Sequence, residues 1–298
     1  MSRGKFFPTL ALLVLLFPFR LSARVMMVVS GRGAQYEEII TSFKQSYSGI
    51  TEEYNLMGLE DEARKLGEAI TAKRPDLMIV VGNLAAKTAK EYCPGCAVVY
   101  AAADNVRGLK LEGSKISGVS VHPASAKVIE NLKLALPGLQ QIGILYHPTY
   151  AGKEIAELKA AAQKAGLKLE AVPVTQIKEI PDALNQLLPR IDAYLMLDDP
   201  GVVTSDTFPF IFMTCFQKKI PIFATSYDLI AKGALAGYAP DPATFGSELA
   251  LLANQALNRK PASMEKPAPG QLFLNTKIAS MWNFNFAPAA RSQAVMIQ

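Results

Sequence analysis

Histidine, cysteine and tryptophan are scarce in this chain of 298 residues, which contains two His, three Cys and one Trp. A structural zinc site takes about four Cys or His ligands. The pair Cys93 and Cys96 has neither a second Cys pair nor a nearby His to complete such a set, so we expect no metal site. His122 and His147 both precede Pro, and we interpret each as a loop histidine rather than a catalytic base.

Motifs of common enzyme classes are also missing. The sequence contains no nucleophile elbow, no P-loop and no His-Glu-x-x-His pattern. The segment Gly31-Arg32-Gly33 is not a dinucleotide fingerprint, because Tyr36 stands where a third glycine is required. These absences predict a protein that is not an enzyme and that uses no cofactor.

Excess charge of one sign is absent as well. Half of the residues are apolar, which excludes a disordered chain, and the formal charge of +5 at first suggests an acidic partner. Three of the 31 basic residues and none of the 26 acidic residues lie in Met1–Ala23, so the rest of the chain carries +2. A chain this close to neutrality has no electrostatic footprint for nucleic acid.

The first 23 residues have the pattern of a signal peptide. Two early basic residues, Arg3 and Lys5, precede an apolar run from Phe6 to Phe19, and small Ala23 ends the segment. The run is too short to span a bilayer of about 30 Å. We therefore expect an exported protein, soluble after cleavage and periplasmic in a bacterium with two membranes.

The residues between Cys93 and Cys96 favour a turn that closes the pair. Pro94 and Gly95 suit the central places of a type II turn, which brings its outer Cα atoms within about 7 Å, a range compatible with a disulfide. In an oxidising compartment we favour a structural bridge. The alternatives are two reduced thiols and a redox-active or metal-binding pair. Cys215 lies in an apolar stretch, and we expect a buried thiol.

Short apolar runs alternate with helical patterns along the chain. Val25–Ser30, Asp76–Val81 and Ala97–Ala101 lack polar alternation, as strands of a parallel sheet covered on both faces do. A second series begins after a break near Ser120–Pro123. Its strands are expected at Gln141–Tyr146, Lys168–Val174, Ala193–Leu197, Ile220–Ala224 and Ala236–Tyr238, with a helix at Thr204–Gln217 among its helices. The pattern predicts an α/β fold with two Rossmann-like lobes.

The residues that follow the expected strands are the candidate ligand contacts, because open α/β sheets bind ligands at the carboxyl ends of their strands. Glycine turns at helix starts expose N–H groups to an anion, acids can receive an ammonium or hydroxyl group, and tyrosines offer flat walls. Any single one of these residues is also an ordinary turn residue. The candidates are Gly31, Arg32, Gln35, Gly82, Asn83, Leu84, Ala103, Asp104, Tyr146, His147, Asp198, Asp199, Ser226, Tyr227 and Tyr238.

Several segments, in order, resemble substrate-binding proteins of ABC transporters related to the tryptophan and aromatic amino-acid binders. Lys73–Ala86 is similar to the family's KPDvIvaiGTpAA stretch, and Ile116–Val121 is similar to its nvTGVS crossover. Leu136–Pro148 resembles LlPgvkriGvLYNP. Ile220–Phe223 and Gly233–Ala236 resemble IPVfgsd…GAlaa.

The resemblance implies a type I periplasmic-binding fold with three hinge crossings, near Ser120–Pro123, near Gly237–Pro242 and before Leu272. Residues 24–120 with about 238–262 would form the N-terminal lobe, and 121–237 with about 270–298 the C-terminal lobe. The implied function is capture of a small polar, amino-acid-like ligand between the lobes by a monomer that delivers it to an ABC permease. The alternative is a periplasmic sensing subunit that signals to a membrane receptor.

The candidate contacts depart from the family pattern. Asn83 replaces the Thr or Ser of its GT turn, while Asp104 keeps the acid of its vTDP segment. The Asn-Pro and Glu-x-Asn-Ser residues that grip an amino-acid headgroup read His147-Pro148-Thr149-Tyr150-Ala151-Gly152 here. Asp199 keeps the acid of PxDN, and Ser226-Tyr227-Asp228 stands for SDED. These changes leave the identity of the ligand open.

Overall fold

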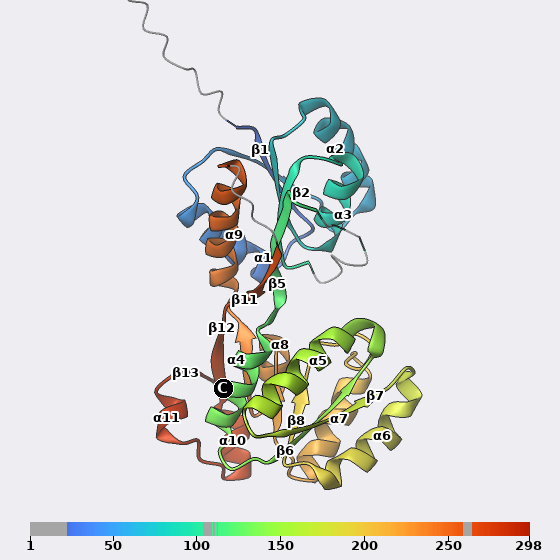
Figure 1. Cartoon of the computed structure of the whole chain (residues 1–298), viewed down its shortest axis with the longest axis vertical. Helices are drawn as coiled ribbons and strands as arrows, with labels where there is room; N and C mark the ends of the chain where they lie inside the picture. The colour runs from blue at the N-terminus through green and yellow to red at the C-terminus, as the bar shows by residue number, and fades with distance from the viewer. Residues whose placement is uncertain (1–22, 104–108, 110, 112, 259–263) are drawn as a thin grey trace, which may run out of the picture.

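The computed structural model describes residues 23–103, 109, 111, 113–258 and 264–298. Apart from Ala23, the expected signal peptide lies outside the described residues, and so does Asp104. The described chain forms two lobes, each built on its own sheet with helices on both faces (Figure 1). We call them the N-lobe and the C-lobe.

The N-lobe sheet has the strand order β11-β5-β4-β3-β1-β2, and each of its pairings is parallel. Every residue of β1 and β3 is buried, because α1 and α9 cover one face of the sheet and α2 and α3 the other. The strands are β1 (Val25–Val29), β2 (Thr51–Asn55), β3 (Leu77–Val81), β4 (Ala97–Ala101), β5 (Ile116–Pro123) and β11 (Met264–Ala268). The helices are α1 (Ala34–Ser46), α2 (Glu60–Lys73), α3 (Asn83–Tyr92) and α9 (Pro242–Leu257).

The C-lobe sheet has the order β13-β12-β10-β9-β8-β6-β7, and β12 runs antiparallel to β10 while the other pairings are parallel. Its strands are β6 (Gln141–Tyr146), β7 (Lys168–Pro173), β8 (Ala193–Met196), β9 (Ile222–Ala224), β10 (Ala236–Pro240), β12 (Gly270–Asn275) and β13 (Ala294–Ile297). Its helices are α4 (Ser125–Ala135), α5 (Pro148–Lys164), α6 (Ile180–Leu187), α7 (Thr207–Gln217), α8 (Tyr227–Ala231), α10 (Thr276–Trp282) and α11 (Pro288–Arg291).

Three segments carry the chain between the lobes (Figure 1): β5 leads into α4, β10 leads into α9, and β11 leads into β12. Because β5 leaves the N-lobe at its carboxyl end and lies parallel to β4, the carboxyl ends of the N-lobe strands point toward the C-lobe. By the same reasoning from β10 and β9, the carboxyl ends of the parallel C-lobe strands point toward the N-lobe. Both sets of strand-end turns therefore face the other lobe.

The two predicted βα series are present, but several elements were not expected, among them the polar strand β2 and the apolar strand β13. The sequence analysis did not identify β2, whose residues Thr-Glu-Glu-Tyr-Asn contain no apolar run because the strand forms an exposed edge of the sheet. The helix expected from Thr204 begins at Thr207. The Thr204 hydroxyl accepts hydrogen bonds from the N–H groups of Asp206 and Thr207, at 3.3 and 3.2 Å, which closes a turn before the helix.

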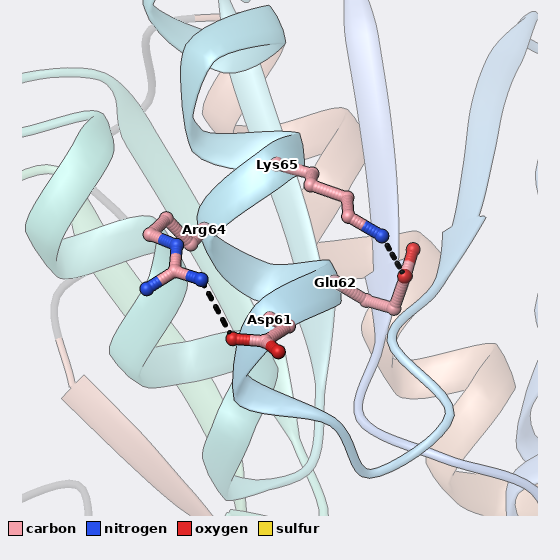
Figure 2. A network of polar contacts seen from close by, with 4 residues as sticks. All are labelled: Asp61, Glu62, Arg64 and Lys65. Carbon is pink, nitrogen blue, oxygen red and sulfur yellow. Dashed lines mark hydrogen bonds and ion pairs between the residues drawn. The ribbon is translucent and has the colours of Figure 1, made fainter.

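The outward face of α2 carries charges that solvent surrounds. Figure 2 shows Arg64 reaching Asp61 at 2.7 Å and Lys65 reaching Glu62 at 2.6 Å, each pair three residues apart on the helix. Exposed pairs of this kind contribute about 0–1 kcal/mol each. The acids also lie in the first helical turn, where they oppose the positive end of the helix dipole. This cluster is a solvated helix face rather than a site.

The cysteines lie away from the strand-end turns. Cys93 and Cys96 form a disulfide with a Cα–Cα distance of 5.7 Å. They connect the end of α3 to the start of β4, which places the bridge at the amino-terminal edge of the N-lobe sheet. A hollow of about 330 Å³ beside the bridge is lined by Ile70, Arg74 and Tyr92 among others. Cys215 is a free, fully buried thiol, as expected, and burial raises its pKa to about 12.

Candidate functional site

Gly82 brings the turns after β1 and β3 into contact. Its φ of +90° belongs to a region that glycine adopts without strain. A Cβ at this position would lie 2.5 Å from the Ser30 hydroxyl oxygen and 3.0 Å from the Tyr36 hydroxyl oxygen. The Ser30 hydroxyl lies in the space that the missing Cβ leaves, and it accepts a hydrogen bond of 2.9 Å from the N–H of Ala85 in the first turn of α3. The starts of α1 and α3 are thereby held side by side.

Asn55 at the end of β2 fixes the turn that follows β1. Its side-chain amide donates to the Gly31 carbonyl at 2.9 Å, while its carbonyl oxygen accepts from the Met57 N–H at 2.8 Å. The Gly58 N–H donates to the Ser30 carbonyl at 2.7 Å. Asn55 was not among the candidates, since it ends the strand β2, which was not predicted, and its partner Gly31 lies 24 residues away.

The other N-lobe candidates occupy the same edge of the sheet. Arg32 and Asn83 are exposed, whereas Gly82 and Ala103 are buried and Leu84 is half-buried. Gln35 lies in the first turn of α1. Among the described residues near this edge, Arg32 is basic and Glu37, in the first turn of α1, is acidic, while the candidate Asp104 lies outside the described residues. The backbone of two helix starts lies at this edge, which suits the anionic end of a ligand.

In the C-lobe, Asp199 connects two strand-end turns, as Ser30 does in the N-lobe. Its carboxylate is 3% exposed and accepts hydrogen bonds from the His147 N–H at 2.7 Å and the Gly201 N–H at 2.8 Å. The turn after β8 is thereby attached to the turn after β6. Asp198 or Asp199 was expected to receive an ammonium or hydroxyl group of the ligand. Asp198 is exposed, and both oxygens of Asp199 already accept backbone N–H groups, so its visible role is to position these turns.

Aromatic rings and a capped helix complete the C-lobe edge. The His147 ring lies 4.8 Å from the exposed ring of Tyr150, between centroids. Tyr227 is exposed and meets Phe273 of β12 edge-on at 5.2 Å. Ser226 caps α8, its hydroxyl accepting from the Leu229 N–H at 3.4 Å. The two remaining tyrosine candidates, Tyr146 and Tyr238, are half-buried.

Two buried side-chain oxygens of the described residues have no hydrogen-bond partner, Oε1 of Glu154 and Oγ1 of Thr225. Thr225 directly follows β9, and Glu154 lies on the second turn of α5. Neither was predicted. Glu154 is four residues before Leu158 and three after Ala151, both buried, so its place on the inward face of α5 was the available signal.

Within the described part of the chain, no group of three His, Cys, Asp or Glu side chains is arranged to hold a metal ion. No helix there has the length and apolar character that crossing a membrane requires.

Comparison with known proteins identifies the family. Residues 46–286 match the family model for ABC transporter substrate binding proteins. The chain belongs to that family. Its predicted family and its two-lobed α/β fold of the type I periplasmic-binding kind are thus confirmed.

A curated relative of the chain is a tyrosine-binding protein of Clostridioides difficile, 22% identical over 205 residues. The match covers 66% of this chain and spans about 59% of the length of that relative.

Solved structures of similar fold include those of two bacterial proteins. One is an ABC domain from Streptococcus pneumonia in complex with L-Trp, with 20% identity, a TM-score of 0.64, and coverage of 92% of this chain and 100% of that one. Another is the ligand-free, open form of a substrate binding protein with adhesive properties from Clostridium difficile, with 17% identity, a TM-score of 0.74, and coverage of 93% and 100%. At these identities the likeness establishes the fold.

Proposed function

We propose that this substrate-binding protein captures a small, polar, amino-acid-like solute between its lobes and delivers it to an ABC permease. The observation that carries the proposal is the chemistry of the two strand-end edges, which face each other across three connecting segments. The N-lobe edge offers backbone N–H groups near Arg32, and the C-lobe edge offers the exposed side chain of Asp198 and aromatic rings. A zwitterion with an apolar side chain matches both edges.

Relatives support the ligand class. One similar protein is a tyrosine-binding protein, and the structure of another was solved in complex with L-Trp. In this chain His147, Tyr150, Tyr227 and Tyr238 lie at or near the C-lobe edge, where planar side chains can pack against an aromatic ligand. We therefore place aromatic amino acids first among the candidate ligands, with other small amino acids next.

The lobes are proposed to close over the ligand by rotation about the three connecting segments, a recognised switching mode of two-lobed binding proteins. In this proposal residues 24–120 with about 238–262 move as one body, and 121–237 with about 270–298 as the other. The protein acts as a monomer outside the cytoplasm, in the periplasm where an outer membrane exists, after removal of residues 1–23.

Calorimetric titration of the purified protein with each common amino acid tests the proposal. A ligand present at about 100 times its dissociation constant should also stabilise the fold by about 2.7 kcal/mol, which a thermal-shift assay detects. Saturable binding of at least one amino acid is expected. Absence of heat and of thermal shift across the whole panel would contradict the proposal.

Transport is tested separately in cells. Deletion of the gene should abolish uptake of the radiolabelled amino acid that binds best, and a plasmid copy should restore it. Unchanged uptake together with a lost transcriptional response to that amino acid would favour the sensing alternative.

A further inference from the structure

Glu154 is a buried acid that the fold leaves unsatisfied. Its side chain is 14% exposed, and Oε1 is buried without a hydrogen-bond partner. Oε2 lies 3.5 Å from Nδ1 of His122, longer than an ordinary hydrogen bond. Leaving a buried polar group without a partner costs about 1–3 kcal/mol, and more for a charged one. A carboxyl group in this position therefore needs an explanation.

The surroundings of Glu154 belong to the region between the lobes. His122 is near the end of β5, in the first connecting segment, and its side chain is 38% exposed. Asp199, which holds the turns after β6 and β8, acts electrostatically on Glu154, as does Glu157 of α5. Glu154 itself lies about 9 Å along α5 from Pro148, the first residue of the helix. One carboxyl group is thus close to a hinge strand and to the C-lobe edge.

The electrostatic balance at this place favours a cation. Burial raises the pKa of Glu154, His122 lowers it, and the carboxylates of Glu157 and Asp199 raise it further. Glu154 is therefore the acid that has an unpaired oxygen and lies beside His122, while Asp199 and Glu157 act on it electrostatically. A positive group that reached Glu154 would supply the missing hydrogen bond to Oε1 and would offset the repulsion from the other two acids.

We propose that Glu154 receives the primary ammonium group of the bound solute, with His122 beside it on the hinge strand. The inference rests on the proposed function and deepens it, since it selects solutes that carry an ammonium over those that carry only a carboxylate. An ammonium has three N–H donors, so it can reach Oε1 of Glu154 and still have donors for other oxygens. Rotation about the first connecting segment moves His122 relative to α5 and opens the way to the carboxyl group.

Binding should also be linked to protons. If Glu154 carries a proton before binding, an arriving ammonium ionises it, the carboxylate keeps both oxygen atoms as acceptors, and the proton passes to the buffer. The ligand itself remains protonated. Calorimetry in two buffers of different ionisation enthalpy measures the number of protons released.

The experiment compares two proteins with two pairs of probes, and the members of each pair differ in the ammonium group. Wild type and Glu154→Gln are titrated with L-tyrosine and with its deamino analogue 3-(4-hydroxyphenyl)propanoate, and the same is done with L-tryptophan and indole-3-propanoate. In wild type, removal of the ammonium should weaken binding by about tenfold to a hundredfold, the usual range for a hydrogen bond to a charged group. In Glu154→Gln the two probes should differ much less, and proton release should disappear.

Glu157→Gln is the matched control. Glu157 lies one helical turn further along α5, is 56% exposed, and has Lys153 at 3.8 Å. The control should show the wild-type preference for the ammonium-bearing probes. The inference is overturned if loss of the ammonium costs Glu154→Gln as much affinity as it costs wild type. If no amino acid binds wild type at all, the proposed function is overturned, and the role of Glu154 with it.

Discussion

The hydrogen bonds that hold the strand-end turns use different side chains in the two lobes. In the N-lobe the ties are neutral: the Ser30 hydroxyl accepts from Ala85, and the Asn55 side chain bridges Gly31 and Met57. In the C-lobe the acceptor is charged, since the Asp199 carboxylate accepts hydrogen bonds from the backbone N–H groups of His147 and Gly201. Each edge thus keeps its own electrostatic character, one suited to an anionic group and the other to a cation.

This comparison predicts that the N-lobe edge is most sensitive to backbone geometry. Gly82→Ala should destabilise the fold by about 3 kcal/mol, because φ of +90° strains an alanine and its Cβ would meet the Ser30 hydroxyl. Chemical denaturation measures the change. Gly152→Ala is the control, since no atom lies within 4 Å of its Cβ position. Alanine in a helix is more stable than glycine by about 0.5–1 kcal/mol, so this variant should gain stability by about that amount. A Gly82 variant as stable as wild type would contradict the packing described.

Removal of the Asp199 carboxylate should have the next largest effect on stability. Asp199→Asn keeps one acceptor oxygen and turns an NH2 group toward a backbone N–H, so we expect a loss of about 2 kcal/mol. Ligand affinity should fall as well, because the turns that carry His147 and Gly201 loosen. Denaturation and calorimetry on the same protein separate the two effects. Unchanged stability would show that the carboxylate does not hold the turns.

Loss of the hydrogen bond between Ser30 and Ala85 should destabilise the protein less. Ser30→Ala removes the acceptor of the Ala85 N–H, and a neutral hydrogen bond of this kind contributes about 1 kcal/mol. Hydrogen exchange should show faster opening at the start of α3 and little change in the C-lobe. If Ser30→Ala destabilised the protein more than Asp199→Asn, the contrast between the lobes would be wrong.

The smallest effect concerns pH. Burial raises the pKa of Glu154 above its ordinary value of 4.5, so between the two values the folded protein binds more protons than the unfolded chain. Stability should therefore fall as pH rises through this window, and Glu154→Gln should remove that part of the slope. Thermal melts over a pH series compare the variant with wild type. Parallel curves would show that Glu154 has no raised pKa.

The sequence predicted the parts of the fold in which local pattern and burial agree. Val25–Val29 and Leu77–Val81 are apolar throughout because both faces of the sheet are covered, so they were recognised. The edge strand Thr51–Asn55 was missed because its residues face solvent. Two buried clusters in each lobe confirm that the strands separate two layers of helices.

The places of some candidate residues were predictable because these residues directly follow a strand. Gly82 and His147 lie at such positions, and each turn is held as part of its edge. Their contacts with a ligand stay a prediction. The task of Asp199 was not predictable, since one of its partners is an N–H group of another turn. Glu154 was missed, although it lies on the inward face of α5, because an acid in an amphipathic helix normally faces water.

A crystal structure of the wild-type protein with a bound amino acid tests the central claim most directly. The account predicts a ligand enclosed by both lobes, with its ammonium nitrogen about 3 Å from the Glu154 carboxyl group and its carboxylate facing the starts of α1 and α3. A ligand bound in the reverse orientation, or outside the strand-end turns, would contradict the account.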